Sequence, residues 1–179
     1  MLAAAGVAVL AVGLPQAAWL DGHPAQLVIP LLWVVAGLDA RDGRVMRAGV
    51  LVGLSGGLEL WGVLGACALL LAPEMRGAAR ALGIAAAVFT VPLAPFVLFG
   101  DFRMFQYEWL VTAGRPPAGL IEPGSPFGCP LRVAQAAASV SAGAAVAYLL
   151  RRRPEAVWAV PLAGAGVRLF IGPLVYAAY

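Results

Sequence analysis

Glu59 is the residue whose chemical type and position most clearly suggest a reaction. It lies near the middle of a long apolar run, Ala48–Ala72, where an ionised carboxylate is costly unless it is protonated, paired or hydrated. At helical spacing its face also carries Ser55, Gly56, Gly62 and Ala66. Such small residues either pack closely on another helix or line a cavity. We therefore expect Glu59 to face inward, either as a protonated acid that can donate a proton or as a structural acid satisfied by one partner.

Arg168 is the clearest partner for this acid. It lies in the middle of the apolar run Val157–Ala178, and its guanidinium cannot deprotonate to escape the cost of burial. A pair between Arg168 and Glu59 would be architectural and would keep the carboxylate ionised. If Arg168 instead meets Asp101, Glu108 or an anionic group of a substrate, Glu59 can be neutral. The sequence leaves these alternatives open.

The remaining chemistry is acid–base chemistry on an apolar substrate. The sequence has one histidine, His23, and no pattern typical of a catalytic triad, a phosphate-binding loop or a metal site, so we expect no cofactor and no metal. A protonated acid can protonate an alkene or an epoxide, and aromatic ring faces can stabilise the resulting cation. The residues expected to bind such a substrate are Ser55, Trp61, Phe96, Trp109 and Arg168.

The composition indicates that membrane helices position these residues. The chain has 179 residues, of which 62% are hydrophobic and 12% charged, and its mean hydropathy is +0.89. Soluble domains have about 45–50% apolar and about 25% charged residues, and a chain this short cannot hide such an excess from water. The basic residues are all arginines in small groups, which excludes the basic stripe of a nucleic-acid-binding protein. The two cysteines exclude a disulfide scaffold.

Six apolar runs are long enough, or nearly so, to cross about 30 Å of hydrocarbon as helices. They are Leu2–Leu20, Pro24–Leu38, Ala48–Ala72, Ala81–Gly100, Leu131–Leu150 and Val157–Ala178. We therefore expect one all-α transmembrane domain over residues 1–179, a multi-pass helix bundle of the cell membrane without a sheet. The second run is short, and we expect it either to extend through Asp39 and Ala40 or to lie where the bilayer is thin.

Small residues predict the helix contacts within this bundle. The stripe of Gly49, Gly53 and Gly57 repeats every four residues and suits close contact with another helix. The run Leu131–Leu150 is rich in Ala, Val, Ser and Gly, so we expect it to be a central, closely packed helix.

The long connection over residues 101–130 has two halves. Asp101–Ala113 is aromatic and mixed-polar, and Trp and Tyr settle at the depth of the lipid headgroups. We expect this half to form a short interfacial helix, a re-entrant helix or a distorted seventh crossing. Gly114–Pro130 contains five prolines and four glycines and should be irregular.

The arginines outside the spans do not orient a six-helix bundle. Six crossings place six arginines on one side and five on the other, so the positive-inside rule is undecided. A seventh crossing changes the division to seven against four and places the N-terminus in the cytoplasm.

The stretch Arg41–Glu59 (RDGRVMRAGVLVGLSGGLE) resembles the integral-membrane terpene cyclases of meroterpenoid and indole-terpenoid pathways. The matching positions are Arg41, Asp42, Met46 and Glu59. The resemblance implies a compact seven-helix bundle in which Glu59 protonates a prenyl epoxide or terminal alkene without a metal. The family's second acid lies in its last helix. No acid follows Glu155 here, so Asp101 or Glu108 would have to take that role.

Two other classes of protein fit the same sequence. A transport or small-molecule-binding subunit would also use an acid and an arginine in the middle of the membrane. A structural subunit of a larger membrane complex would use the glycine stripe and the alanine-rich run as contact faces. An enzyme should purify alone or as a small homo-oligomer with bound lipid or isoprenoid, whereas a subunit should purify with its partner proteins.

Overall fold

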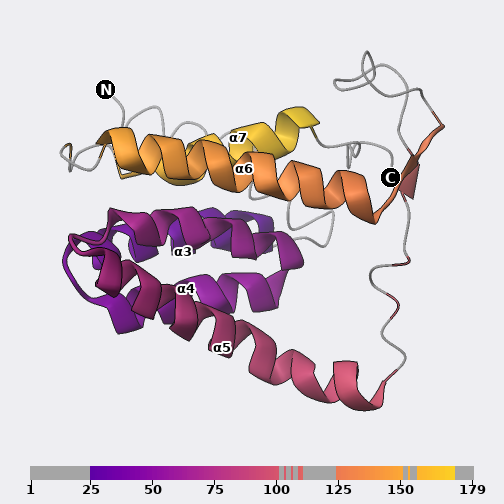
Figure 1. The fold of residues 1–179 in the computed structure, drawn as a ribbon, viewed down its shortest axis with the longest axis horizontal. Helices are drawn as coiled ribbons and strands as arrows, with labels where there is room; N and C mark the ends of the chain where they lie inside the picture. The colour runs from indigo at the N-terminus through magenta and orange to yellow at the C-terminus, as the bar shows by residue number, and fades with distance from the viewer. Residues whose placement is uncertain are drawn as a thin grey trace.

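The computed structural model describes residues 25–100, 103, 106, 109–110, 124–150, 153 and 157–171, and these residues are mostly helical. Figure 1 shows α3, α4 and α5 on one side of the molecule and α6 and α7 on the other, with α6 running roughly alongside α3. The first apolar run, Leu2–Leu20, lies outside the described residues. The second half of α5 extends away from the other helices (Figure 1).

The first described helices, α3 (Ala25–Arg41) and α4 (Val45–Leu58), are joined by a tight turn. The amide of Arg44 donates to the carbonyl of Asp39 and that of Gly43 to the carbonyl of Ala40, the two hydrogen bonds of a Schellman motif. Gly43 has φ +77°, a conformation that favours glycine. As expected, the helix over the described part of this run continues through Asp39 and Ala40, to Arg41.

The run Ala48–Ala72 does not form one helix, so this predicted span is wrong. The α4 helix ends at Leu58, Glu59 is extended (φ −148°, ψ 144°), and a 3₁₀ helix, η1 (Leu60–Leu71), follows. Gly62 explains why the chain can fold back here, because a Cβ on Gly62 would lie 1.9 Å from the carbonyl oxygen of Ser55. The apolar run is therefore a helical hairpin with Glu59 at its tip.

The 3₁₀ helix packs on α3 through one row of buried residues, three of them small. With three residues per turn, positions three apart share a face, and Gly62, Gly65, Ala68 and Leu71 are all buried. A Cβ on Gly65 would lie 2.2 Å from the ring of Trp33, so the indole rests directly on the backbone of η1. Farther along the row, Ala68 and Leu71 approach Gly37 of α3.

The α5 helix (Met75–Phe99) packs on α4 through the predicted glycine stripe. A Cβ on Gly49 would meet the carbonyl oxygen of Ala81 at 2.4 Å, and one on Gly53 would meet Val88 at 2.6 Å. The predicted close contact is therefore confirmed for these two glycines. Gly57 has no described neighbour within reach of a Cβ, so the prediction is wrong there.

The α6 helix (Cys129–Leu150) packs on η1 through a single stripe, Ser139, Gly143 and Ala147. Gly143 of this stripe contacts Cys67 of η1. The other residues of α6 are half-buried or exposed, so α6 lies at the edge of the described helices and the prediction of a central helix is wrong. The last described helix, α7 (Ala159–Ile171), lies against α6 and covers Ser139 and Cys67 through Gly164.

The described chain also contains a small sheet, which the all-helical prediction excluded. Strand β1 (Trp109–Leu110) pairs antiparallel with β2 (Pro126–Phe127), and Trp109 lies opposite Phe127. A helix over Asp101–Ala113 is therefore wrong at Trp109 and Leu110. The two-residue ladder instead ties the ends of the long connection together.

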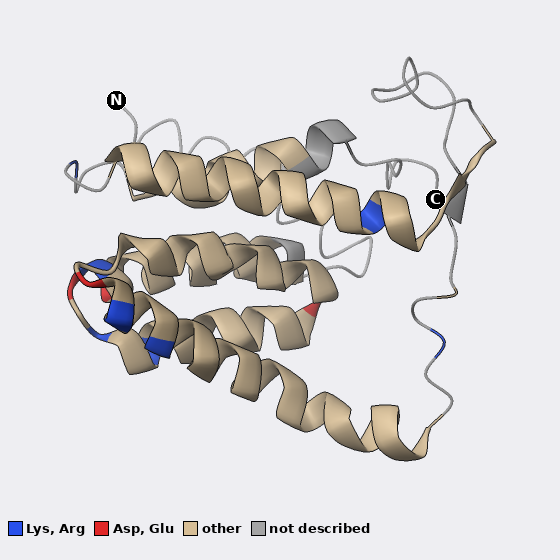
Figure 2. Ribbon diagram, viewed as in Figure 1, with Lys and Arg blue, Asp and Glu red and all other residues tan. Residues whose placement is uncertain are grey.

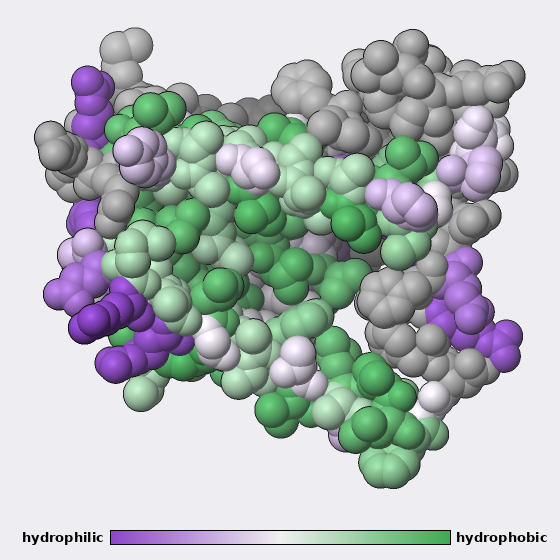
Figure 3. Space-filling model, in the orientation of Figure 1, coloured by the Kyte–Doolittle hydropathy of each residue, from purple (hydrophilic) through white to green (hydrophobic). Residues whose placement is uncertain are grey.

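Six clear membrane spans are likewise wrong. Among the described residues, two helices are long and apolar enough to cross a membrane, α5 and α6, whereas α4 and η1 are shorter apolar helices. Only 6% of the apolar stretch of α5 is buried, unlike the core helix of a soluble protein, and Figure 3 shows a largely hydrophobic face over α5 and α6. Together with the composition, these two helices indicate that the protein associates with a membrane.

Candidate functional site

The tip of the α4–η1 hairpin holds two of the predicted site residues, Glu59 and Trp61. Both side chains are half-buried, and the indole Nε1 of Trp61 donates a hydrogen bond to Oε2 of Glu59. The amide of Glu59 donates to the carbonyl oxygen of Ser55 at 3.3 Å, the last backbone hydrogen bond of α4, but the extended Glu59 does not lie on a continuous helix face. The break in the helix is what brings the carboxylate and the indole together.

Trp33 of α3 packs against Trp61 of this pair. Its ring lies edge-on to Trp61, with centroids 5.3 Å apart and planes at 80°, a favoured geometry for two aromatic rings. Its Nε1 lies 2.9 Å from the carbonyl oxygen of Gly62 and 3.1 Å from Oγ of Ser55. Trp33 is fully buried, so it holds the hairpin in place rather than offering a face to a ligand.

Ser55 was expected to bind substrate, but its environment is that of a structural residue. It is fully buried, and its Oγ lies 2.7 Å from the carbonyl oxygen of Val52 and 2.9 Å from that of Gly62. The two carbonyl oxygens share the single hydroxyl proton of Ser55, while its Oγ accepts a hydrogen bond from Nε1 of Trp33. Ser55 therefore joins α3, α4 and η1, and the prediction of substrate contact is not supported.

The other predicted site residues do not join this cluster in the described part of the chain. Phe96 is 67% exposed on the far half of α5, about two helical turns beyond Phe89, which contacts Gly56 of α4. The structure describes only the backbone of Trp109, in β1, and of Arg168, in α7. Asp101 and Glu108 are also outside them, so the alternatives for Arg168 remain untested.

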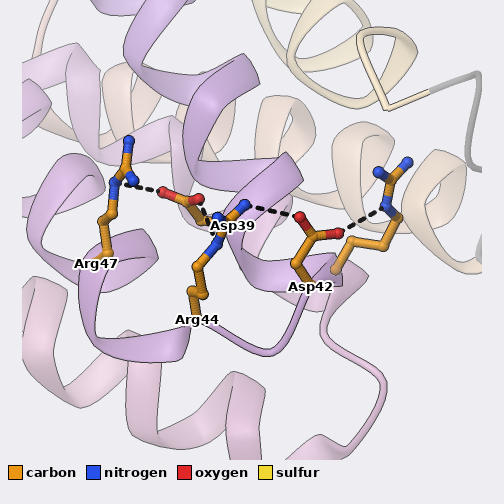
Figure 4. A network of polar contacts seen from close by, with 5 residues as sticks. Asp39, Asp42, Arg44 and Arg47 are labelled. Carbon is orange, nitrogen blue, oxygen red and sulfur yellow. Dashed lines mark hydrogen bonds and ion pairs between the residues drawn. The ribbon is translucent and has the colours of Figure 1, made fainter.

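Asp39 was not predicted as a site residue, yet it has the most unusual environment. Its side chain is 3% exposed at the last turn of α3, where its Oδ1 and Oδ2 each lie 2.9 Å from an arginine Nε, of Arg44 and Arg47 respectively. The Arg47 contact is an ion pair without the alignment of a hydrogen bond. Nη2 of Arg44 also lies 2.7 Å from Oδ2 of the exposed Asp42, and Figure 4 shows the resulting chain of alternating charges.

A groove of about 520 Å³ opens beside these arginines at the start of α4. The described residues that line it are Gly43, Arg44, Val45, Met46, Arg47, Val50 and Leu51. The surface of the groove is almost entirely apolar, with Met46 70% exposed, and the half-exposed guanidinium groups of Arg44 and Arg47 lie at its edge. The signal that could have revealed this region is the spacing of Asp39, Arg44 and Arg47 around a glycine turn.

Among the described residues, no group of three or more His, Cys, Asp or Glu side chains could hold a metal ion. Both cysteines are thiols, and the more buried one, Cys67 of η1, packs against Gly143 of α6. No family model, curated protein sequence or solved structure shows significant similarity to this chain. The chemistry of the hairpin tip and of the groove therefore has to be argued from their own residues.

Proposed function

We propose that the protein is a membrane-embedded enzyme that uses Glu59 as a general acid on an apolar, isoprenoid-like substrate. The observation that carries this proposal is the contact between Glu59 and Trp61 at the tip of an apolar hairpin, with Trp33 stacked edge-on behind it. The arrangement supplies a proton donor next to an aromatic surface. The resemblance of the stretch Arg41–Glu59 to terpene cyclases implies the same chemistry.

In this proposal α5 and α6 cross the bilayer, and the α4–η1 hairpin enters it without crossing. The 14 residues of α4 rise about 21 Å, which is less than the roughly 30 Å of the hydrocarbon core. Non-helical backbone at such depth is tolerated where protein buries it, and the break at Glu59 is packed against Trp33 and Ser55. Glu59 would then meet substrates that enter laterally from the lipid.

The proposed reaction is an isomerisation that needs no cofactor. The proton of the Glu59 carboxyl moves to an epoxide oxygen or to the terminal carbon of an alkene, and the carbon–oxygen or π bond breaks. A second double bond of the substrate attacks the cation and forms a carbon–carbon bond. Transfer of a proton from a neighbouring carbon to the Glu59 carboxylate regenerates both an alkene and the acid, so the product has the mass of the substrate. The face of the Trp61 indole would stabilise the intermediate charge.

The test uses purified protein in lipid nanodiscs with an epoxidised polyprenyl alcohol, and it measures cyclic isomers by gas chromatography and mass spectrometry. Glu59→Gln keeps the shape and the acceptor for Trp61 but removes the transferable proton. We expect turnover to fall by roughly 10²–10⁴-fold. The matched control is Glu74→Gln, because Glu74 is an exposed acid at the N-cap of α5 without a side-chain capping hydrogen bond. Unchanged turnover in Glu59→Gln, or no isomer from the wild type, would contradict the proposal.

A second function, binding and transport of a substrate coupled to proton movement, is favoured by the same helix break. Discontinuous helices whose ends meet inside the membrane form the binding sites of many transporters. In this case proteoliposomes would show uptake driven by a pH gradient, Glu59→Gln would abolish the dependence on the gradient, and no isomer would form.

A further inference from the structure

The hairpin brings the charged turns of the described chain to one end of the molecule. The α3–α4 turn lies there because α3 and α4 are antiparallel, and the start of α5 lies there because η1 returns along α4. Ala40, Ala48, Ala72 and Ala78 share one buried cluster, which confirms that the two turns are neighbours. We call this region the basic end, and its charged residues are Arg41, Arg44, Arg47, Arg76, Arg80, Asp39, Asp42 and Glu74.

The basic end carries an excess of positive charge toward the solvent. Five arginines face three acids, and the one deeply buried member is an acid, Asp39. The side chains of Arg44 and Arg47 are 53% and 61% exposed, and their Nε atoms face Asp39 while each guanidinium has further N–H donors. Figure 2 shows the blue and red segments of α3, α4 and α5 gathered at this end.

The same geometry orients the protein in the membrane. A continuous helix over Ala48–Ala72 would have placed Arg76 and Arg80 across the bilayer from Arg44 and Arg47. With the hairpin, all four lie on one side. The C-terminal part of α6 joins them, because Ala147 packs with Leu71 and Leu38 near the ends of η1 and α3. Arginines concentrated on one side favour a cytoplasmic location for that side.

We propose that the basic end faces the cytoplasmic leaflet and binds one anionic phospholipid, with the headgroup phosphate on Arg44 and Arg47 at the edge of the groove and the apolar part of the lipid in the groove. The groove is shallow and almost entirely apolar, which suits hydrocarbon next to a charged headgroup. Arg44 and Arg47 would hold the phosphate, since guanidinium forks bind phosphate oxygens through paired hydrogen bonds. Met46, Val50 and Leu51 would contact the glycerol and the first carbons of the acyl chains.

The test must leave the ion pairs of Asp39 intact, because removing an arginine could unfold the turn. Met46→Glu introduces a negative charge into the groove, and Met46→Gln is the matched neutral control. Binding is measured by native mass spectrometry of the detergent-purified protein with added phosphatidylglycerol or phosphatidylcholine. One charge near an anionic lipid is worth about 1 kcal/mol, so we expect Met46→Glu to weaken phosphatidylglycerol binding about fivefold, with Met46→Gln close to the wild type.

Each result decides the proposal. Equal affinity for the two lipids, or equal loss in Met46→Glu and Met46→Gln, would overturn it. Displacement of phosphatidylglycerol by an equal concentration of inorganic phosphate would show a simple anion site and would also overturn it. The double variant Arg76→Gln/Arg80→Gln removes charge from the same end but outside the groove. A loss of lipid as large as that in Met46→Glu would show diffuse attraction instead of a site.

The orientation is tested separately by labelling Met75→Cys, whose native side chain is 60% exposed at the start of α5, in a background where Cys129 is replaced by Ala. In right-side-out vesicles a membrane-impermeant maleimide should label this cysteine only after permeabilisation. Labelling of intact vesicles would overturn the cytoplasmic location. Neither experiment depends on Glu59, so their outcomes are independent of the proposed enzyme activity.

Discussion

The two ends of the α3–α4 pair satisfy their buried polar groups in opposite ways. At the hairpin tip, neutral groups of Trp33, Ser55 and Gly62 satisfy one another through hydrogen bonds, and the ionisable side chain described there is Glu59. At the basic end, a buried carboxylate is satisfied by two half-exposed arginines. The first solution depends on close backbone contact and tolerates no added atom, whereas the second depends on charge and can relax into solvent. The tip should therefore be the more sensitive to small changes in shape.

The largest effect that we expect on stability is from Gly62→Ala. The new Cβ would lie 1.9 Å from the carbonyl oxygen of Ser55, so the hairpin must open. We expect the free energy of unfolding, measured by SDS titration in mixed micelles, to fall by more than about 3 kcal/mol. Gly57→Ala is the control, because nothing described lies within 4 Å of its Cβ, and the alanine should be neutral or slightly stabilising. Equal behaviour of the two variants would contradict the hairpin.

An intermediate effect is expected from Asp39→Asn at the basic end. The substitution keeps the shape but removes the charge that pairs with Arg44 and Arg47, and the partners can still reach water. We expect a loss of about 2 kcal/mol in the same titration. Asp42→Asn provides the comparison, because its side chain is 43% exposed and its ion pair is screened, so the loss should stay below about 0.5 kcal/mol. If both variants lost the same free energy of unfolding, the burial of Asp39 would not explain the loss.

The smallest effect is expected from Gly43→Ala in the α3–α4 turn. A residue other than glycine at φ +77° is strained, and the cost should be about 1 kcal/mol. Gly83→Ala, in the middle of α5 with nothing described near its Cβ, should instead gain up to about 1 kcal/mol from higher helix propensity. The difference in thermal midpoint between the two variants measures the effect. A gain for both would show that the turn relaxes without cost.

Local signals predicted the elements whose ends are marked by polar residues or glycine. The α5 and α6 helices appear where apolar runs of suitable length begin and end, although α5 begins six residues before the expected Ala81 and α6 two before Leu131. Gly49 and Gly53 also behave as their spacing predicts. Of the candidate site, Glu59 and Trp61 were identified. The role of Trp33 was missed, because a buried indole in an apolar run looks like any other core residue.

The sequence by itself determined that this chain is apolar enough to associate with a membrane. Only the tertiary structure decided where the run Ala48–Ala72 folds back. Its residues are almost uniformly apolar, so hydropathy contains no boundary. The break at Glu59 becomes favourable only when Trp33 and Ser55 satisfy the carbonyl of Gly62 and the period-three row of η1 meets α3. Strand β1 likewise exists only because β2, about 16 residues away, supplies its hydrogen-bonding partner.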